Sequence, residues 1–165
     1  MKRLTLLLAA IALFGAADTS FAGDGDPPPS FKDKQGICIL NPLAAPHLMP
    51  GTKEWNFRTR ISEGTAVVCA NFDGAFTVVT WGCGTECQDG AMVDRTDGKI
   101  YWLPDLASYG YEYHAESSLL IVNPFSKADF SDGQVPDYLW REFYEFSHSK
   151  WVLLYRDKGY TTTTE

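Results

Sequence analysis

The segment that decides the fold is Phe76-Thr-Val-Val-Thr-Trp-Gly-Cys-Gly-Thr-Glu-Cys87, followed by Gln88-Asp-Gly-Ala-Met-Val-Asp94. Its β-branched and aromatic residues predict a strand from Phe76 to Trp81, and a second strand is expected from Gly90 to Asp94. Two glycines between these strands release the backbone, and the two cysteines are expected to fix it again. The segment therefore predicts a strand, a constrained loop and a returning strand.

Further hairpin signals follow toward the C-terminus. Arg95-Thr-Asp-Gly98 predicts a tight turn, because Asp-Gly suits positive φ angles. More strands are expected over residues 99–103, 109–114, 118–122, 138–146 and 150–155. Residues 139–146 could instead form a helix. Since successive strands lie close in sequence, we expect a mainly β domain with an antiparallel meander. The meander could form a single sheet, a sandwich or a partial propeller, stabilised by disulfides.

One short N-terminal helix is expected before these strands. Thr52 suits the N-cap and Gly64 suits the end of such a helix. Helical spacing is kept by three residues between them: Trp55, Arg58 and Ile61. The prediction is a helix over residues 53–63, with an irregular loop as the alternative. A short strand over residues 65–69 and a turn over residues 71–74 are then expected.

The first residues have the pattern of a secretory signal peptide. Met1-Lys-Arg3 is basic, an apolar run extends from Leu4 to Ala17, and Ser20-Phe-Ala22 places small residues before a cleavage site. The apolar run is shorter than the ~20 residues that a membrane span needs. We therefore expect residues 1–22 to be removed and the protein to be periplasmic or secreted, with no stable membrane insertion. A buried N-terminal helix is the alternative.

Three parts are expected after the cleavage site. Residues 23–34 form a polar, proline-rich flexible lead-in, residues 35–158 a single β-rich domain, and residues 159–165 a flexible tail. The formal net charge is −7 for the whole chain and −8 without residues 1–22, which carry a net charge of +1. This charge disfavours nucleic acid and anionic membranes as partners and favours basic ones, although it could also serve solubility alone.

The four cysteines all follow the predicted cleavage site: Cys38, Cys69, Cys83 and Cys87. An even number in an oxidising compartment predicts two disulfides, for which three connectivities exist. We favour Cys83 with Cys87 and Cys38 with Cys69, because each partner is then near in sequence. The C-x-x-C spacing of redox and metal sites and the neighbouring histidines of metal sites are missing, so no metal and no cofactor are indicated.

Catalytic side-chain types are most concentrated around His114, in Tyr111-Glu-Tyr-His-Ala-Glu-Ser-Ser118. A small periplasmic hydrolase could use His114 and Glu116 together with turn carboxylates. Those carboxylates are Asp73, Glu86, Asp89, Asp94 and Asp97. On a strand, however, His114 and Glu116 would share one solvated face with Ser118. The chain also has no G-x-S-x-G elbow, and aspartates in turns commonly cap their own backbone. Hydrolysis is therefore the alternative function.

A non-catalytic binding protein is the preferred interpretation. A constrained loop, an acidic surface and a surplus of aromatic residues suit recognition of a protein or envelope ligand. One form of this hypothesis is an inhibitor or immunity protein that neutralises a basic enzyme. Four residues are expected to bind the partner: Thr85 and Glu86 in the loop, and Trp81 and Trp102 beside it.

The loop Trp81-Gly-Cys-Gly-Thr-Glu-Cys87 resembles that of a family of small exported bacterial proteins of unknown function with a W-G-C-G-T-x-C loop. The family pattern also has an Asn-Phe-x-Gly-His-Tyr turn, an aspartate and a Thr-x-Gly-Lys turn. Here these are similar to Asn71-Phe-Asp-Gly74, Asp94 and Thr96-Asp-Gly-Lys99. This chain has Ala75-Phe76 where the family has His-Tyr. The resemblance implies a shared fold and export but no particular activity.

Overall fold

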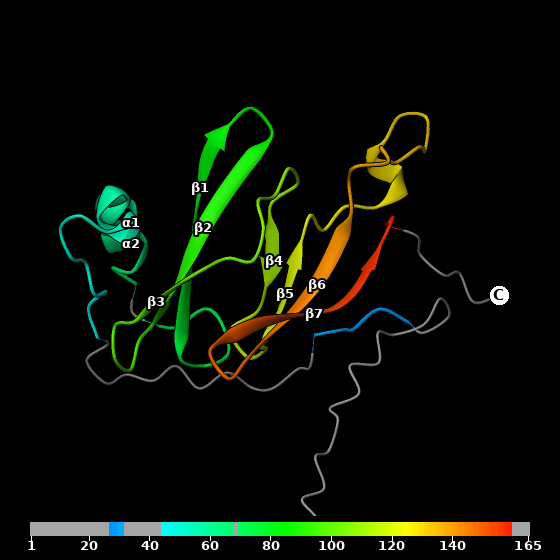
Figure 1. Ribbon diagram of the computed structural model, residues 1–165. Coiled ribbons are helices and arrows are strands. Elements are labelled where there is room, and N and C mark those ends of the chain that lie inside the picture. The colour runs from blue at the N-terminus through cyan, green and yellow to red at the C-terminus, as the bar shows by residue number, and fades with distance from the viewer. Residues whose placement is uncertain (1–26, 32–43, 68, 160–165) are drawn as a thin grey trace, which may run out of the picture.

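The computed structural model describes residues 27–31, 44–67 and 69–159 (Figure 1). The predicted signal peptide, most of the predicted lead-in, Cys38 and residues 160–165 lie outside the described residues. All helices and strands of the structure belong to this described part of the chain.

The first sheet contains three antiparallel strands in the order β1-β2-β3. These are β1 (Phe76–Gly84), β2 (Cys87–Asp94) and β3 (Ile100–Trp102). Strand β1 continues three residues beyond the predicted end at Trp81, and β2 begins three residues before Gly90, so the predicted loop is largely a strand hairpin. The predicted turn between β2 and β3 is confirmed: the Gly98 N–H donates to the Asp94 carbonyl at 2.8 Å.

The second sheet contains four antiparallel strands in the order β4-β5-β6-β7. They are β4 (Tyr111–Tyr113), β5 (Leu119–Val122), β6 (Arg141–Ser147) and β7 (Lys150–Asp157). A short 3₁₀ helix, η1 (Lys127–Asp129), lies in the loop between β5 and β6. The helical alternative for residues 139–146 is wrong, because β6 pairs with strands on both sides.

Two short helices replace the single helix predicted over residues 53–63. Helix α1 (Lys53–Asn56) begins at Thr52, whose Oγ1 accepts the Trp55 N–H at 3.3 Å, as expected for an N-cap. Phe57 then leaves helical geometry, and α2 (Arg58–Gly64) follows it. The Phe57 ring stacks on Trp81 of the first sheet, with centroids 4.8 Å apart. The helix is therefore interrupted where a side chain packs on the sheet.

Residues 65–67 and 69 form no strand, so the strand predicted over residues 65–69 is wrong. Thr65 instead ends α2, and its hydroxyl donates to the Ile61 carbonyl at 2.7 Å. The next segment covers the outer edge of β1: the Asn71 side-chain amide accepts the Val78 N–H at 2.7 Å and donates to the Val78 carbonyl at 3.1 Å. One side chain thus pairs with the edge as a neighbouring strand would.

The two sheets lie face to face around the largest core, so the predicted antiparallel meander is confirmed and its strands are divided between two packed layers (Figure 1). Buried residues from both sheets and from the segments beside them form this core: Phe72, Val78, Met92, Leu103, Ala107, Leu120, Val122 and Phe146. Alternate residues of β1 and β2 point the other way and pack against Phe57 and Ile61. Helices, first sheet and second sheet therefore form three successive layers.

Hydrogen bonds also join the two sheets directly. The Trp151 indole N–H donates to the Trp102 carbonyl at 2.9 Å, which joins β7 to β3. The Tyr111 hydroxyl lies 3.0 Å from the Gln88 carbonyl, which joins β4 to β2. Polar tips of aromatic side chains are thus satisfied at the margins of the aromatic core.

Gly90 allows the close packing of β2 and provides a test of this arrangement. A Cβ atom there would lie 2.7 Å from both the Val79 carbonyl oxygen and the Leu103 Cδ1. We expect Gly90→Ala to lower the free energy of unfolding by about 1–3 kcal/mol, as overpacked interiors do. Urea denaturation followed by tryptophan fluorescence measures the change.

Gly82→Ala is the matched control in the same hairpin, since its new Cβ would come no closer than 4.0 Å to any non-neighbouring atom. That variant should stay within about 0.5 kcal/mol of the wild type. Equal stability of the two variants would contradict the packing described for β2.

Candidate functional site

The β1–β2 hairpin ends in a disulfide-closed turn at residues 82–87, which we call the hairpin tip. Cys83 and Cys87 are bonded, with their Cα atoms 5.1 Å apart, as predicted. The register shifts between Gly82 and Gly84, so Cys83 forms a bulge in β1. All residues from Gly82 to Glu86 are exposed. The hairpin tip therefore supplies no buried side chain to the fold, and the disulfide restricts its shape.

The backbone of the hairpin tip depends on two unusual angles. Gly84 has φ +154° and Glu86 has φ +51°. The first suits glycine and the second places a non-glycine residue in the left-handed region, which Asn, Asp and Gly tolerate best. The Glu86 side chain is exposed and makes no hydrogen bond or ion pair with any other described residue. Its carboxylate is therefore available to a partner.

The strand residues that adjoin the hairpin tip are held by the segment of chain that crosses to the second sheet. Gln88 exchanges backbone hydrogen bonds with Ala107, at 2.7 and 3.0 Å. The Tyr111 hydroxyl lies 2.7 Å from the Asp105 carbonyl as well as near the Gln88 carbonyl. Burial raises the pKa of Tyr111, and the nearby carboxylates of Asp89 and Asp105 raise it further. The hairpin tip thus extends from a strand residue, Gln88, that pairs with Gly82 on one side and with Ala107 on the other.

Trp81 lies inside the molecule, with only 6% of its surface exposed. Its ring packs between Phe57, at a centroid distance of 4.8 Å, and Trp102, at 5.8 Å. Its indole N–H has no hydrogen-bond partner in the described part of the chain. Trp81 therefore supports the hairpin beneath the helices, and its side chain offers almost no surface to a partner.

Trp102 is half-buried and lies at the edge of the same cluster. Its indole N–H donates to Glu54 Oε1 at 2.9 Å, and this bond is the largest of the effects that lower the pKa of Glu54. The Lys53 ammonium lies 3.4 Å from the Trp102 ring centroid, an arrangement that attracts the cation to the ring face. Helix α1 therefore covers part of the Trp102 ring through Lys53 and Glu54, whereas Thr85 and Glu86 are exposed at the hairpin tip.

His114 and Glu116 do not lie on a strand, so the predicted polar strip is wrong. Strand β4 ends at Tyr113, and residues 114–118 form the turn into β5. The His114 ring stacks on Phe31 with centroids 3.8 Å apart, and its Nε2 lies 3.9 Å from Glu112 Oε1. No hydrogen bond or ion pair joins His114 to Glu116 in the described residues.

Three of the carboxylates predicted to lie in turns accept nearby backbone N–H groups, although Asp89 lies within β2. Asp89 accepts the Gly90 N–H at 2.7 Å, Asp94 accepts the Thr96 N–H at 2.8 Å, and Asp97 accepts the Lys99 N–H at 2.8 Å. The bonds of Asp94 and Asp97 stabilise the turn between β2 and β3. Among the described residues, no three His, Cys, Asp or Glu side chains are gathered as they would be around a metal ion.

Cys69 is also disulfide-bonded. Its predicted partner, Cys38, lies outside the described residues. No helix in the described ranges is long and apolar enough to cross a membrane.

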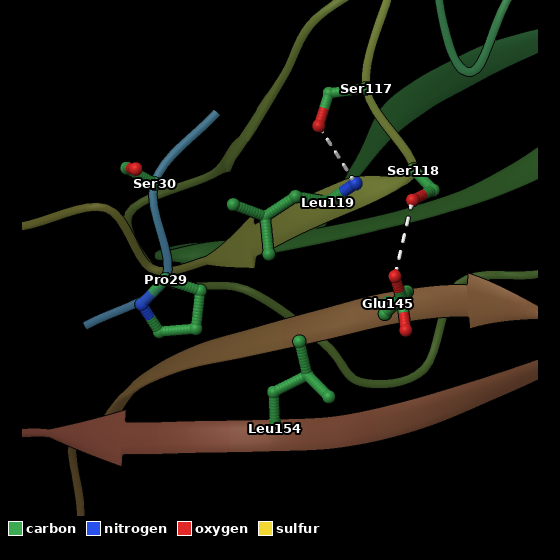
Figure 2. Close-up of a pocket in the computed structure, with 7 residues that line it drawn as sticks. All are labelled: Pro29, Ser30, Ser117, Ser118, Leu119, Glu145 and Leu154. Carbon is green, nitrogen blue, oxygen red and sulfur yellow. Dashed lines mark hydrogen bonds between the residues drawn. The ribbon is translucent and has the colours of Figure 1, made fainter. Parts of the chain in front are cut away.

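A pocket on the far face of the second sheet was not predicted (Figure 2). It has a volume of about 310 Å³ and is lined by Pro29, Ser30, Ser117, Ser118, Leu119, Glu145 and Leu154. These residues come from four separate segments of the chain. No local motif marks them, so sequence patterns alone could not have found this pocket.

Comparisons with protein-family models, with curated proteins and with solved structures give no match. The resemblance of the Trp81–Cys87 loop to a family of small exported proteins therefore stays a prediction.

The disulfide of the hairpin tip leads to a prediction on stability. Cys83 and Cys87 close a loop of five residues, and the chain-entropy model gives about 2 kcal/mol for such a short loop. We expect Cys83→Ser with Cys87→Ser to lower the free energy of unfolding by up to this amount. The far-UV circular dichroism should stay unchanged, because the hairpin tip buries no side chain. Loss of the β-sheet signal would contradict this description of the tip.

Tyr111 leads to a prediction on alkaline stability. Its pKa is raised in the folded protein, so its contribution to stability is complete below the unfolded pKa of about 10 and is lost as the pH rises above it. Tyr111→Phe should cost about 1 kcal/mol at neutral pH through its lost hydrogen bonds. It should also reduce the alkaline slope by up to about 1.4 kcal/mol per pH unit.

Denaturant titrations between pH 8 and about pH 11 measure both effects of Tyr111→Phe. Tyr109→Phe is the control, since Tyr109 is 45% exposed and its hydroxyl makes no hydrogen bond within the described residues. Equal alkaline slopes for the two variants would show that Tyr111 does not titrate differently in the folded and unfolded chains.

Proposed function

We propose that the protein is an exported, non-catalytic binding protein that recognises a protein or envelope ligand through the hairpin tip. The observation that carries this proposal is the exposed Glu86 carboxylate on a disulfide-closed turn. A turn held in one shape loses little conformational entropy on binding, so more of the contact energy contributes to affinity. Thr85 lies beside Glu86 and offers a hydroxyl to the same partner.

The partner surface is expected to be basic. Glu86 contributes an exposed negative charge at the hairpin tip, and the whole chain carries a formal net charge of −7. Complementary charge mainly accelerates association and selects among partners. One form of this proposal is an inhibitor or immunity protein directed at a basic enzyme. The negative net charge of the chain supports this form.

The proposed location is the periplasm or the extracellular space. The support comes from the basic start, the apolar run and the small residues up to Ala22, together with the disulfide of the hairpin tip. Disulfides persist in oxidising compartments. Nothing in this proposal requires a cofactor or nucleic acid.

The test is quantitative capture of a partner from envelope extract by the exported form of the chain. We expect Glu86→Asn to reduce the capture of a specific basic species by at least about fivefold, as the loss of a charge-assisted contact would. Asparagine removes the charge and tolerates the positive φ of this position. Unfolding by urea should show a stability change below about 1 kcal/mol.

Glu63→Gln is the matched control, because Glu63 is an exposed carboxylate near the end of α2. It removes the same charge from another part of the surface and should leave capture unchanged. If both variants capture the species equally well, the hairpin tip does not recognise it. If both weaken capture equally, net charge rather than the tip governs binding.

A further inference from the structure

We propose that the pocket on the far face of the second sheet binds a primary alkylammonium group, with its carbon chain along the apolar wall and its charge at Glu145. This site lies on a different sheet from the hairpin tip and goes beyond the function proposed above. The chemical class of ligand includes free aliphatic amines and the lysine side chains of a polypeptide.

The floor of the pocket belongs to β5, β6 and β7. Leu119 pairs with Glu145, and Leu154 lies on the adjacent strand β7 (Figure 2). Leu119 is only 5% exposed and belongs to an apolar cluster with Ile121 and Phe143, against which Leu154 packs. The face of the sheet beneath the pocket is therefore apolar around a single carboxylate.

The opposite wall is the segment 27–31, which crosses this face of the sheet (Figure 2). Pro29 and Ser30 line the pocket, and Phe31 anchors the segment by stacking on His114 at an interplanar angle of 12°. Successive prolines restrict the backbone to an extended form. The space between this wall and the sheet is thus bounded by a stiff segment.

Glu145 supplies the charge of the proposed site. Within the described residues it makes no ion pair, and its one hydrogen bond is a long one, 3.5 Å from the Ser118 Oγ. A half-buried carboxylate next to leucine side chains gains from a cation that brings its own hydrogen-bond donors. Of the other lining serines, Ser117 already accepts the Leu119 N–H with its Oγ at 3.1 Å, and Ser30 lies on the opposite wall. Glu145 and Ser118, which lie side by side on the floor of the pocket, are therefore the groups that receive the charged head in this proposal.

An alkylammonium ion matches these walls better than other small ligands. The pocket volume of about 310 Å³ is at the small end of the range for ligand sites. A four-carbon stem can cover Leu119 and Leu154 while its ammonium donates to Glu145 and Ser118, as long cationic side chains do at apolar surfaces. An anion would be repelled by the Glu145 carboxylate, and a neutral alcohol would leave the charge of Glu145 unpaired.

The first experiment uses the unmodified protein and needs no variant. n-Butylammonium, 1-butanol and butyrate are titrated separately while backbone amide shifts are followed by NMR. We expect n-butylammonium to shift the amides of Ser118, Leu119 and Glu145 with a saturable curve. The alcohol should bind at least about tenfold more weakly, as expected for the loss of one charge-assisted hydrogen bond, and butyrate should not bind. Equal shifts with the amine and the alcohol would overturn the proposal.

The second experiment tests the assigned carboxylate. Glu145→Gln keeps the shape of the side chain and should weaken n-butylammonium binding at least about tenfold. Glu112→Gln is the matched control on strand β4 of the same sheet, where Glu112 is exposed and outside the pocket. Unchanged binding by the Glu145 variant, or equal weakening in both, would overturn the assignment.

The third experiment distinguishes the two sources of the ligand. Capped Gly-Lys-Gly and Gly-norleucine-Gly peptides present the same stem with and without the ammonium. Tighter binding of the lysine peptide than of n-butylammonium supports a polypeptide ligand, and the reverse order supports a free amine. Failure of both cationic probes overturns the proposal. Glu86→Asn should leave all these titrations unchanged, so a failure at this pocket is separable from a failure at the hairpin tip.

Discussion

The contact between aromatic rings of the two sheets is the interaction on which the rest of the structure depends. The Phe76 ring packs edge to face with Phe146 at 5.2 Å, which joins the first strand of one sheet to the third strand of the other. Trp151 lies 5.0 Å from Phe146 and donates a hydrogen bond to the Trp102 carbonyl. Large rings bury much area with few rotatable bonds, so a small number of them can hold two short sheets together. Both proposed sites lie outside this interface, at positions that its formation determines.

Backbone groups at the sheet margins are satisfied by single side chains rather than by further strands. Asn71 pairs with both polar groups of Val78 at the β1 edge. Asn123 joins two loops in a similar way. Its Oδ1 accepts the N–H groups of Ser108 and Tyr109, and its Nδ2 donates to the Trp140 carbonyl. Buried or half-buried backbone groups need such partners. Short strands are thereby sufficient, and surface remains for a projecting hairpin on one sheet and a pocket on the other.

The sequence predicted those features that depend on neighbours in the chain. The β-branched run from Phe76, the Asp-Gly turn and the C-x-x-x-C spacing each carry a local physical cause, and the corresponding strand, turn and disulfide are present. The features that could not be predicted from the sequence depend on tertiary contacts. Phe57 divides the predicted helix because its ring packs on Trp81, and Trp81 is buried because Phe57 and Trp102 cover it. The pocket joins residues 29 and 154, a proximity that no periodicity expresses.

Within the hairpin tip, the residues that determine the backbone shape differ from the residue whose side chain is free of structural contacts. Its shape follows from the disulfide between Cys83 and Cys87 and from the positive φ angles of Gly84 and Glu86. Thr85 and Glu86 contribute nothing to the aromatic core, so most substitutions at Thr85 leave folding untouched. Selection can therefore change the outermost chemistry of this hairpin in small steps while the two sheets remain as they are.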